Sequence, residues 1–206
     1  RDTTDIYALG NNVEIINSIF TNNEVTEDGG ALYISGENCK IYNSTLNDNR
    51  AGDDGGAIYW EGANGIIDGC DFTDNKGLSA GNPSDPSTSK GGTLSVTGDK
   101  LSILNSNFTR GITYNRDNSN VGGAIFITGD DVDIESCNFD ECTASDADGG
   151  TIYIIGDRTT ITNSNISDST ARAGGAIYID GVYASVIDSS FTNTFAKTGA
   201  VYGTDN

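Results

Sequence analysis

The sequence predicts an all-β fold, a parallel β-helix (β-solenoid) in which short strands stack turn upon turn. Three observations lead to this prediction. A glycine pair recurs along the chain, each pair opens a run in which apolar residues alternate with period two, and the same residue types return at the same place in each copy. The copies predict about seven to eight coils of roughly 25 residues.

The glycine pairs mark the start of each copy. They begin at Gly29, Gly55, Gly91, Gly122, Gly149 and Gly174, with a degenerate copy at Gly199. The intervals between them are 26, 36, 31, 27, 25 and 25 residues. A corner between short strands needs a positive φ angle or a close backbone approach, and glycine permits both. We therefore expect a corner at each pair.

The run after each glycine pair predicts a half-buried strand. The residues expected to face inward include Leu32, Ile34, Ile58, Trp60, Ile125, Ile127, Ile177 and Ile179. Those expected to face outward are Tyr33, Tyr59, Phe126, Tyr153 and Tyr178. A second strand alternates in the same way, with the inward pairs Val13 and Ile15, Leu101 and Ile103, and Val132 and Ile134. β-Branched and aromatic residues dominate both runs, which favours strands over helices.

Stacking places like residues of successive coils about 4.8 Å apart, so each position predicts a column. One corner column holds Asn17, Asn43, Asn105 and Asn163, and another holds Asn23, Asn49 and Asn75. Stacked asparagines can pass amide hydrogen bonds from coil to coil. An inward column holds Phe20, Phe72, Phe108, Phe139 and Phe191, with Leu46 and Ile166 in the remaining copies. The rod is expected to be roughly 35 Å long.

The four cysteines are expected to be free and buried. Cys70 and Cys137 replace the serine of the corner in their copies, and Cys39 replaces an inward apolar residue. Cys70 and Cys137 lie two coils apart, which is beyond disulfide reach. Cys142 shares a coil with Cys137 but lies on another segment. A metal site is not predicted, since the chain has no His and no C-x-x-C pair.

The chain carries a net charge of −19, from 11 basic and 30 acidic residues. This balance argues against nucleic acid or an anionic membrane surface as a partner. Acidic residues gather before the glycine pairs, at Glu27, Asp28, Asp53, Asp54, Asp146 and Asp148. Stacked carboxylates would favour Ca²⁺, but other coils place Lys90 or Val121 there. We therefore expect scattered, solvated carboxylates and no cofactor.

Residues 1–206 are expected to form a single segment that is part of a longer surface protein, because the chain begins in mid-pattern. Two copies are longer than the rest, with loop insertions at 76–90 and 110–121. Insertions into consecutive coils should lie side by side and often form a binding face. Arg110, Tyr114 and Arg116 are the candidate ligand-binding residues, since Tyr and Arg dominate interaction hot spots. Neutral decoration of the surface is the alternative.

Catalytic residues are not predicted. A glycosidase needs two carboxylates that face one cleft, and Asp131 with Asp133 is the nearest approach to such a pair. Other copies place ordinary polar residues such as Glu14 and Lys40 in the same slot. Three N-glycosylation sequons begin at Asn43, Asn107 and Asn165. Chance alone can supply them in a chain rich in Asn, Ser and Thr, so glycosylation is possible but is not predicted.

Two motifs resemble those of a known family. "GGAI" at 55–58, 122–125 and 174–177, "GGAL" at 29–32, "FTNN" at 20–23 and "FTDN" at 72–75 resemble the GGA(I/L/V) and FxxN repeats of chlamydial polymorphic membrane proteins. The combination with "NSxFTxN" is also similar to adhesin-like surface proteins of methanogenic archaea. "FTRG" at 108–111 and "FDEC" at 139–142 lack the asparagine. The resemblance implies a right-handed parallel β-helix, carried on a cell surface and used in adhesion.

From these observations we expect a non-catalytic, extracellular adhesin segment that binds a protein or a carbohydrate on a partner cell. The open ends of a solenoid also predict end-to-end self-association. Insertion into the membrane is not expected, because the longest apolar runs, such as "TIYIIG" at 151–156, are too short to cross a bilayer. Two alternatives stay open: a polysaccharide-degrading β-helix enzyme (a lyase or a glycosidase), and a passive structural stalk.

Overall fold

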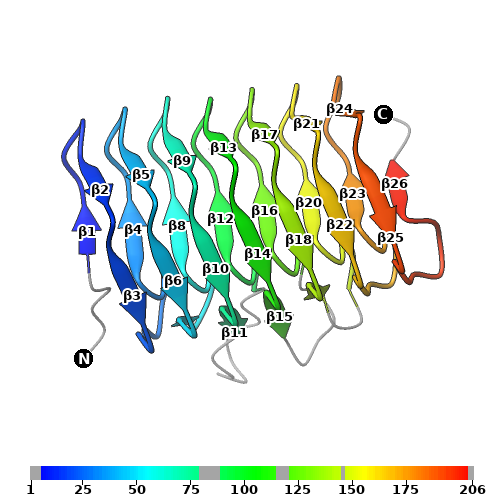
Figure 1. The fold of residues 1–206 in the computed structure, drawn as a ribbon, viewed down its shortest axis with the longest axis horizontal. Helices are drawn as coiled ribbons and strands as arrows, with labels where there is room; N and C mark the ends of the chain where they lie inside the picture. The colour runs from blue at the N-terminus through cyan, green and yellow to red at the C-terminus, as the bar shows by residue number, and fades with distance from the viewer. Residues whose placement is uncertain (1–5, 79–88, 115–120, 145–146, 204–206) are drawn as a thin grey trace.

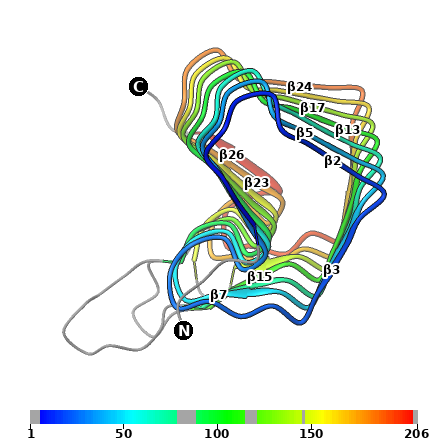
Figure 2. The same cartoon turned by 90° about the vertical axis from the view of Figure 1, so that its left-hand side faces the viewer.

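The computed structural model describes residues 6–78, 89–114, 121–144 and 147–203. These residues form a parallel β-helix, as the sequence predicts (Figure 1). Each coil passes through sheets A, B and C in turn, and the middle coils add a short fourth sheet, D. Viewed along the axis, the chain runs clockwise as it recedes from the N-terminal end, so the β-helix is right-handed (Figure 2).

Sheet A contains the strands that follow the glycine pairs. In spatial order they are β1 (Ile6–Ala8), β4 (Leu32–Ile34), β8 (Ile58–Trp60), β12 (Leu94–Val96), β16 (Ile125–Ile127), β20 (Ile152–Ile154), β23 (Ile177–Ile179) and β26 (Val201–Gly203). Neighbouring strands pair in parallel, so that Ser95 lies opposite both Tyr59 and Phe126. From β4 to β20 the first and third residues are buried in the core, and the middle residue faces outward.

Sheets B and C close the rest of the coil. Sheet B contains β2 (Glu14–Ile16), β5 (Lys40–Tyr42), β9 (Ile66–Asp68), β13 (Ser102–Leu104), β17 (Asp133–Glu135), β21 (Thr160–Thr162) and β24 (Ser185–Ile187). Sheet C contains β3 (Ile19–Thr21), β6 (Thr45–Asn47), β10 (Asp71–Thr73), β14 (Asn107–Thr109), β18 (Asn138–Asp140), β22 (Asn165–Ser167) and β25 (Ser190–Thr192). In both sheets the middle residue of each strand faces the core, as Ile67 and Phe72 do.

Sheet D forms a small lobe beside sheet A (Figure 2). Its strands are β7 (Arg50–Ala51), β11 (Lys76–Leu78), β15 (Ile112–Tyr114) and β19 (Thr143–Ala144). Single bridges at Glu24, Thr170 and Phe195 continue this column into other coils. The lobe turns back toward the outer face of sheet A, so the two meet at an inward corner of the cross-section (Figure 2).

The interior consists of stacked apolar columns. Phe72, Phe108 and Phe139 are buried and stack with ring centroids 4.6 and 4.8 Å apart. The same column continues through Leu46, Phe20, Ile166 and Phe191. This confirms the predicted inward column. Buried aromatic rings dominate core energetics, so the column is a main source of stability.

The corner asparagines have a backbone role that the sequence did not reveal. Asn17, Asn43, Asn105 and Asn163 all have φ between 47° and 51°. Asparagine adopts this left-handed conformation more readily than other residues with a Cβ atom. Close approach matters at the glycine pairs, where a Cβ on Gly56 would lie 2.1 Å from the carbonyl oxygen of Gly92. The recurring residues at these corners are therefore backbone requirements.

The second asparagine column is a buried hydrogen-bond ladder, as predicted. The amide of Asn23 donates to Oδ1 of Asn49 at 2.9 Å, and the amide of Asn49 donates to Oδ1 of Asn75 at 3.0 Å. Asn49 also donates to the carbonyl oxygen of Phe20 at 3.2 Å. Asn49 and Asn75 are fully buried. Each amide is satisfied by a neighbouring coil, which offsets the cost of its burial.

All four cysteines are free and buried, as predicted. Burial raises the pKa of the Cys137 thiol to about 11 and that of the Cys142 thiol to about 12. The thiolate is the reactive form. These side chains therefore act as small apolar residues of the core.

Candidate functional site

An aromatic column runs along the outer face of sheet A. Its members are Tyr7, Tyr33, Tyr59, Phe126, Tyr153, Tyr178 and Tyr202, each the middle residue of its strand. The rings that stack on one another have centroids 4.4 to 5.9 Å apart. Stacked rings cover one another's faces, so a ring face is left without a ring partner only where the column is interrupted.

Among the described strands of sheet A, the column lacks a ring only at Ser95 on β12. One stack ends at Tyr59 and the next begins at Phe126, and Ser95 pairs with both residues. Ser95 is fully buried, and its Oγ has no hydrogen-bond partner. Buried polar atoms are normally paired, so an unpaired hydroxyl calls for an explanation.

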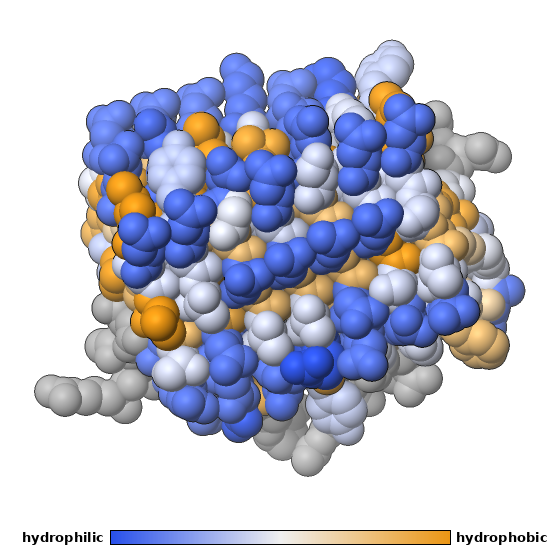
Figure 3. All heavy atoms as spheres, viewed as in Figure 1, coloured by the Kyte–Doolittle hydropathy of each residue, from blue (hydrophilic) through white to orange (hydrophobic). Residues whose placement is uncertain are grey.

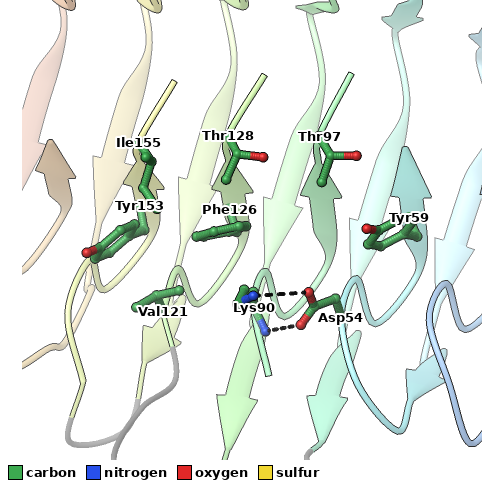
Figure 4. A pocket seen from close by; sticks show the side chains of 9 residues that line it. All are labelled: Asp54, Tyr59, Lys90, Thr97, Val121, Phe126, Thr128, Tyr153 and Ile155. Atoms are coloured by element: carbon green, nitrogen blue, oxygen red, sulfur yellow. Dashed lines mark hydrogen bonds and ion pairs between the residues drawn. The ribbon is translucent and has the colours of Figure 1, made fainter. Parts of the chain in front are cut away.

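A pocket of about 410 Å³ lies over this gap, and we call it the trough. Figure 4 shows its lining as three rows that cross the coils: Thr97, Thr128 and Ile155; Tyr59, Phe126 and Tyr153; and Asp54, Lys90 and Val121. The volume lies within the range of small-molecule sites. Apolar rings line the middle of the trough, and polar groups lie on both sides.

Asp54 and Lys90 form the charged part of the lower row. The backbone N–H of Lys90 donates to Oδ1 of Asp54 at 2.9 Å, and the ammonium lies 3.9 Å from Oδ2 (Figure 4). The same ammonium lies 5.4 Å from the ring centroid of Phe126, within the range of a cation–π contact. Donors and acceptors of both signs therefore border the aromatic surface.

Burial raises the pKa of Asp54 to about 7, although the charge of Lys90 opposes the shift. One coil earlier, burial also raises the pKa of Asp28, whose Oδ1 accepts a hydrogen bond from the backbone N–H of Asp54 at 2.9 Å. The expectation of solvated carboxylates is therefore wrong for these two residues. The coil stacking that places them next to a backbone amide also shields them partly from water.

Arg110, a predicted ligand-binding residue, is held by an ion pair between coils. Its Nε donates to Oδ1 of Asp74 at 2.7 Å, and its Nη2 donates to Oδ2 at 2.8 Å. Glu141 lies 4.0 Å away on the next coil. Arg110 itself has a φ of 52° at a corner. Its guanidinium is therefore already occupied by carboxylates of the same chain.

Tyr114 is 55% exposed at the end of β15, and Arg116 lies outside the described residues. Tyr114 pairs with Leu78, and Lys90 bridges to Val121. The two long intervals therefore leave the regular coil at adjacent points and rejoin it at adjacent points. The points of return, Lys90 and Val121, line the trough. The regular coil extends into both intervals through β11 and β15.

The nearest candidate for a carboxylate pair is occupied by an arginine. Arg158 contacts Asp131 at 2.6 Å and Asp130 at 3.1 Å. Its guanidinium lowers the pKa of Asp131. Asp133 is exposed on β17. Asp131 therefore stays ionised near neutral pH, which does not suit a general acid.

A polar ladder crosses the outer face of sheet C. Figure 3 shows it as a continuous hydrophilic row over the strands that face the viewer in Figure 1. The side-chain amide of Asn107 donates to Asp71 at 2.7 Å, that of Asn138 to Asn107 at 3.0 Å, and that of Asn165 to Asn138 at 3.0 Å. Asn107 and Asn165 are sequon residues, so a glycan on either would remove a ladder hydrogen bond.

Within the described ranges the chain contains no helical segment of the length and hydrophobicity that a membrane span requires. No group of three or more His, Cys, Asp or Glu side chains there could hold a metal ion.

The trough was missed at the level of sequence, although a signal for it exists. Aligning "GGTLSV" at 91–96 with "GGAIYW" at 55–60 and "GGAIFI" at 122–127 places Ser95 where the neighbouring copies have Tyr59 and Phe126. The periodic alternation of the outward residues does not reveal the trough. The information lies in Ser95, the one position that departs from the aromatic pattern.

Two segments of the chain, residues 17–35 and 43–59, match the Chlamydia polymorphic membrane protein repeat. The matches confirm the resemblance to chlamydial repeats that the GGA(I/L) and FxxN motifs suggest. Each segment runs from the corner asparagine through a strand of sheet C and the glycine pair into sheet A. No curated protein and no solved structure matches the chain.

Proposed function

We propose that the chain is a non-catalytic segment of a cell-surface adhesin and that the trough face binds a protein or glycan on a partner cell. The observation that carries the proposal is the aromatic trough on a rod whose repeats match those of a polymorphic membrane protein family. A rigid solenoid with exposed aromatic rings suits recognition, because little conformational entropy is lost on binding.

The long intervals support this choice of face. They rejoin the coil at Lys90 and Val121, which belong to the lining of the trough. Loops placed on a rigid scaffold commonly supply contacts to a partner. Tyr114, exposed on the same lobe, and Arg116 remain proposed contributors. Arg110 would contribute only if a ligand displaced Asp74 from its guanidinium or bound Arg110 and Asp74 together.

An adhesion assay tests the proposal. Beads coated with the chain should adhere to a panel of cells, and the free chain should block adhesion as its concentration rises. Thr128→Trp places a bulky side chain on the trough and should lower adhesion at least fivefold. Thr160→Trp is the matched control, because Thr160 is equally half-buried on sheet B, away from the trough. Equal effects of the two variants would refute the choice of face.

A passive stalk predicts a different result. Replacing residues 79–88 and residues 115–120 each with Gly-Gly would leave β11 and β15 intact. Under the stalk alternative, these deletions leave adhesion by the parent protein unchanged. Under the adhesin proposal, adhesion falls.

A glycan-cleaving enzyme is the second candidate, and Asp54 is the observation that favours it. A carboxyl group with a pKa of about 7 in a pocket is typical of a general acid. Glycosidases use two carboxylates, and Asp54 is the one carboxylate among the described residues that line the trough. Release of reducing sugar from neutral or acidic polysaccharides, lost in Asp54→Asn but retained in Asp131→Asn and Asp133→Asn, would establish this alternative.

A further inference from the structure

We propose, building on the adhesin function above, that the gap at Ser95 is a slot for one neutral sugar ring of gluco configuration. The ring would lie between the faces of Tyr59 and Phe126. Its hydroxyl groups would meet the polar groups around the trough. The ligand class is thus a glycan that exposes a β-linked glucose or N-acetylglucosamine residue.

The spacing of the coils sets the width of the slot. Ser95 is the strand partner of both Tyr59 and Phe126, so the two rings are separated by two coil spacings. At about 4.8 Å per spacing, this is roughly 9.6 Å. A ring midway would lie about 4.8 Å from each neighbour, which falls within the 4.4 to 5.9 Å observed along the rest of the column. The slot therefore has the thickness of one ring.

Two aromatic walls restrict which ring can enter. The face of an aromatic ring is electron-rich and attracts C–H groups, which carry partial positive charge. In a β-gluco ring all the hydroxyl substituents are equatorial, so both faces present C–H groups. A manno or galacto ring has one axial hydroxyl that makes one face polar. A site with rings on both sides therefore favours the gluco configuration.

The polar groups match the edge of a sugar. The Oγ of Ser95 is buried without a partner beneath the lining of the trough, so a ligand reaches it only when Lys90 moves aside. Thr97 and Thr128 place hydroxyls on one side, and Asp54 and Lys90 supply an acceptor and a donor on the other. A phenylalanine side chain of a partner protein would fill the gap but leave the buried Oγ of Ser95 unpaired, which lowers affinity. A polyol satisfies them.

In the free protein the gap is closed to solvent, because Ser95 has no exposed surface, Phe126 is only 4% exposed, and Lys90 lies over it. Its ammonium lies over the ring of Phe126, and its side chain is 37% exposed. The ion pair with Asp54, at 3.9 Å, is long. Such a partly exposed pair contributes little stability, so the side chain can move aside and donate to a sugar hydroxyl. The trough then holds one carboxyl group and one ammonium, which favours a neutral ligand. The net charge of −19 disfavours acidic glycans.

The first test is a titration of the ¹⁵N-labelled chain with cellobiose, followed by amide chemical shifts. The expected result is a saturable shift at Ser95, Thr97 and Thr128. β-1,4-Mannobiose, the matched control sugar, should bind at least fivefold more weakly, and 3′-sialyllactose should do the same. N-acetyltyrosinamide serves as the probe for an aromatic side chain. Saturable shifts with N-acetyltyrosinamide but not with cellobiose would overturn the proposal, as would equal affinity for cellobiose and mannobiose.

Three variants tie the binding to the slot. Ser95→Tyr fills the gap with the residue that neighbouring coils already hold there, so it should fold and should weaken cellobiose binding at least tenfold. Tyr59→Ala removes one wall and should weaken binding about fivefold. Tyr178→Ala removes a ring from the same column outside the trough, so binding should stay within twofold. Unchanged binding in folded Ser95→Tyr would refute the slot.

The adhesion assay separates this proposal from the adhesin function. If Ser95→Tyr beads adhere as well as wild-type beads and cellobiose gives no shifts, the slot is wrong while the adhesin function stands. If wild-type beads fail to adhere but cellobiose shifts Ser95 and its neighbours in the wild type only, the slot stands and the adhesin function is wrong.

Discussion

The phenylalanine column of sheet C and the aromatic column of sheet A share one spacing but have opposite surroundings. Phe72, Phe108 and Phe139 stack inside the coil and are buried. The rings of sheet A stack on the outside, and most of them are half-exposed. The inner column has an apolar residue at every described position, whereas the outer column has Ser95.

The two columns differ because a missing side chain lowers the stability of the fold more inside the coil than on its outer face. Inside, a missing apolar side chain would leave an expensive cavity, so Leu46 and Ile166 occupy the column where phenylalanine is absent. Outside, a neighbouring side chain such as Lys90, or a ligand, can cover the same space. The repeat thus enforces uniformity on its inner face and tolerates exceptions on its outer face. Exceptions on the outer face are therefore where recognition should be sought.

The largest expected effect comes from breaking the inner column. Phe108→Ala should lower the free energy of unfolding by about 3–5 kcal/mol, because the ring is fully buried between two others. Tyr178→Ala, in the outer column, should lower it by only about 1–2 kcal/mol. Urea unfolding of both variants measures the contrast. Similar losses would show that the two columns do not differ as described.

The asparagine ladders extend the contrast to hydrogen bonds. Asn49→Ala should cost about 2–3 kcal/mol, because the N–H groups of Asn23 and the carbonyl oxygen of Phe20 lose the partner that Asn49 provides. Asn138→Ala, in the exposed ladder of sheet C, should cost about 0.5 kcal/mol, because water replaces the lost bonds. Urea unfolding again provides the measurement. A cost for Asn138→Ala as large as that for Asn49→Ala would contradict this account.

Asp54 sharpens the comparison because it lies on the outer face and yet is largely removed from water. Its pKa is raised to about 7 in the folded chain, so its contribution to stability is complete below its ordinary pKa of 3.8 and is lost as pH rises through 7. Between pH 4.5 and 8, the wild type should lose roughly 3 kcal/mol relative to Asp54→Asn. Unfolding free energies of both proteins at the two pH values test this. Parallel pH profiles would contradict it.

The smallest effect is expected where the outer column is completed. Ser95→Tyr should raise the free energy of unfolding by about 0.5–1 kcal/mol, because the new ring stacks on Tyr59 and Phe126. It also removes a buried hydroxyl that has no partner. Thermal unfolding monitored by circular dichroism measures the gain. A loss of several kcal/mol would mean that the gap is packed by groups that cannot move aside.

Most of the fold follows from the sequence because the repeat is informative at every level. The glycine pairs place the corners, the alternation assigns inside and outside, and the register of copies predicts columns such as Phe72 over Phe108. The trough could not be predicted in the same way. It depends on which outward residues neighbouring coils bring together, and no single copy encodes that combination. The pairing of Arg110 with Asp74 likewise becomes evident only when the copies "FTDN" and "FTRG" are stacked.

The outward middle residue of each sheet A strand has a consequence for how such surfaces diversify. A single codon change from tyrosine to serine at this position opens a notch on one rung, and the reverse change closes it. Neither touches the interior, so natural selection can shift, duplicate or erase notches along the rod while its body stays the same. A long array of such strands would then differ from another array in the positions at which the outward ring is missing, and these positions would distinguish one surface from another.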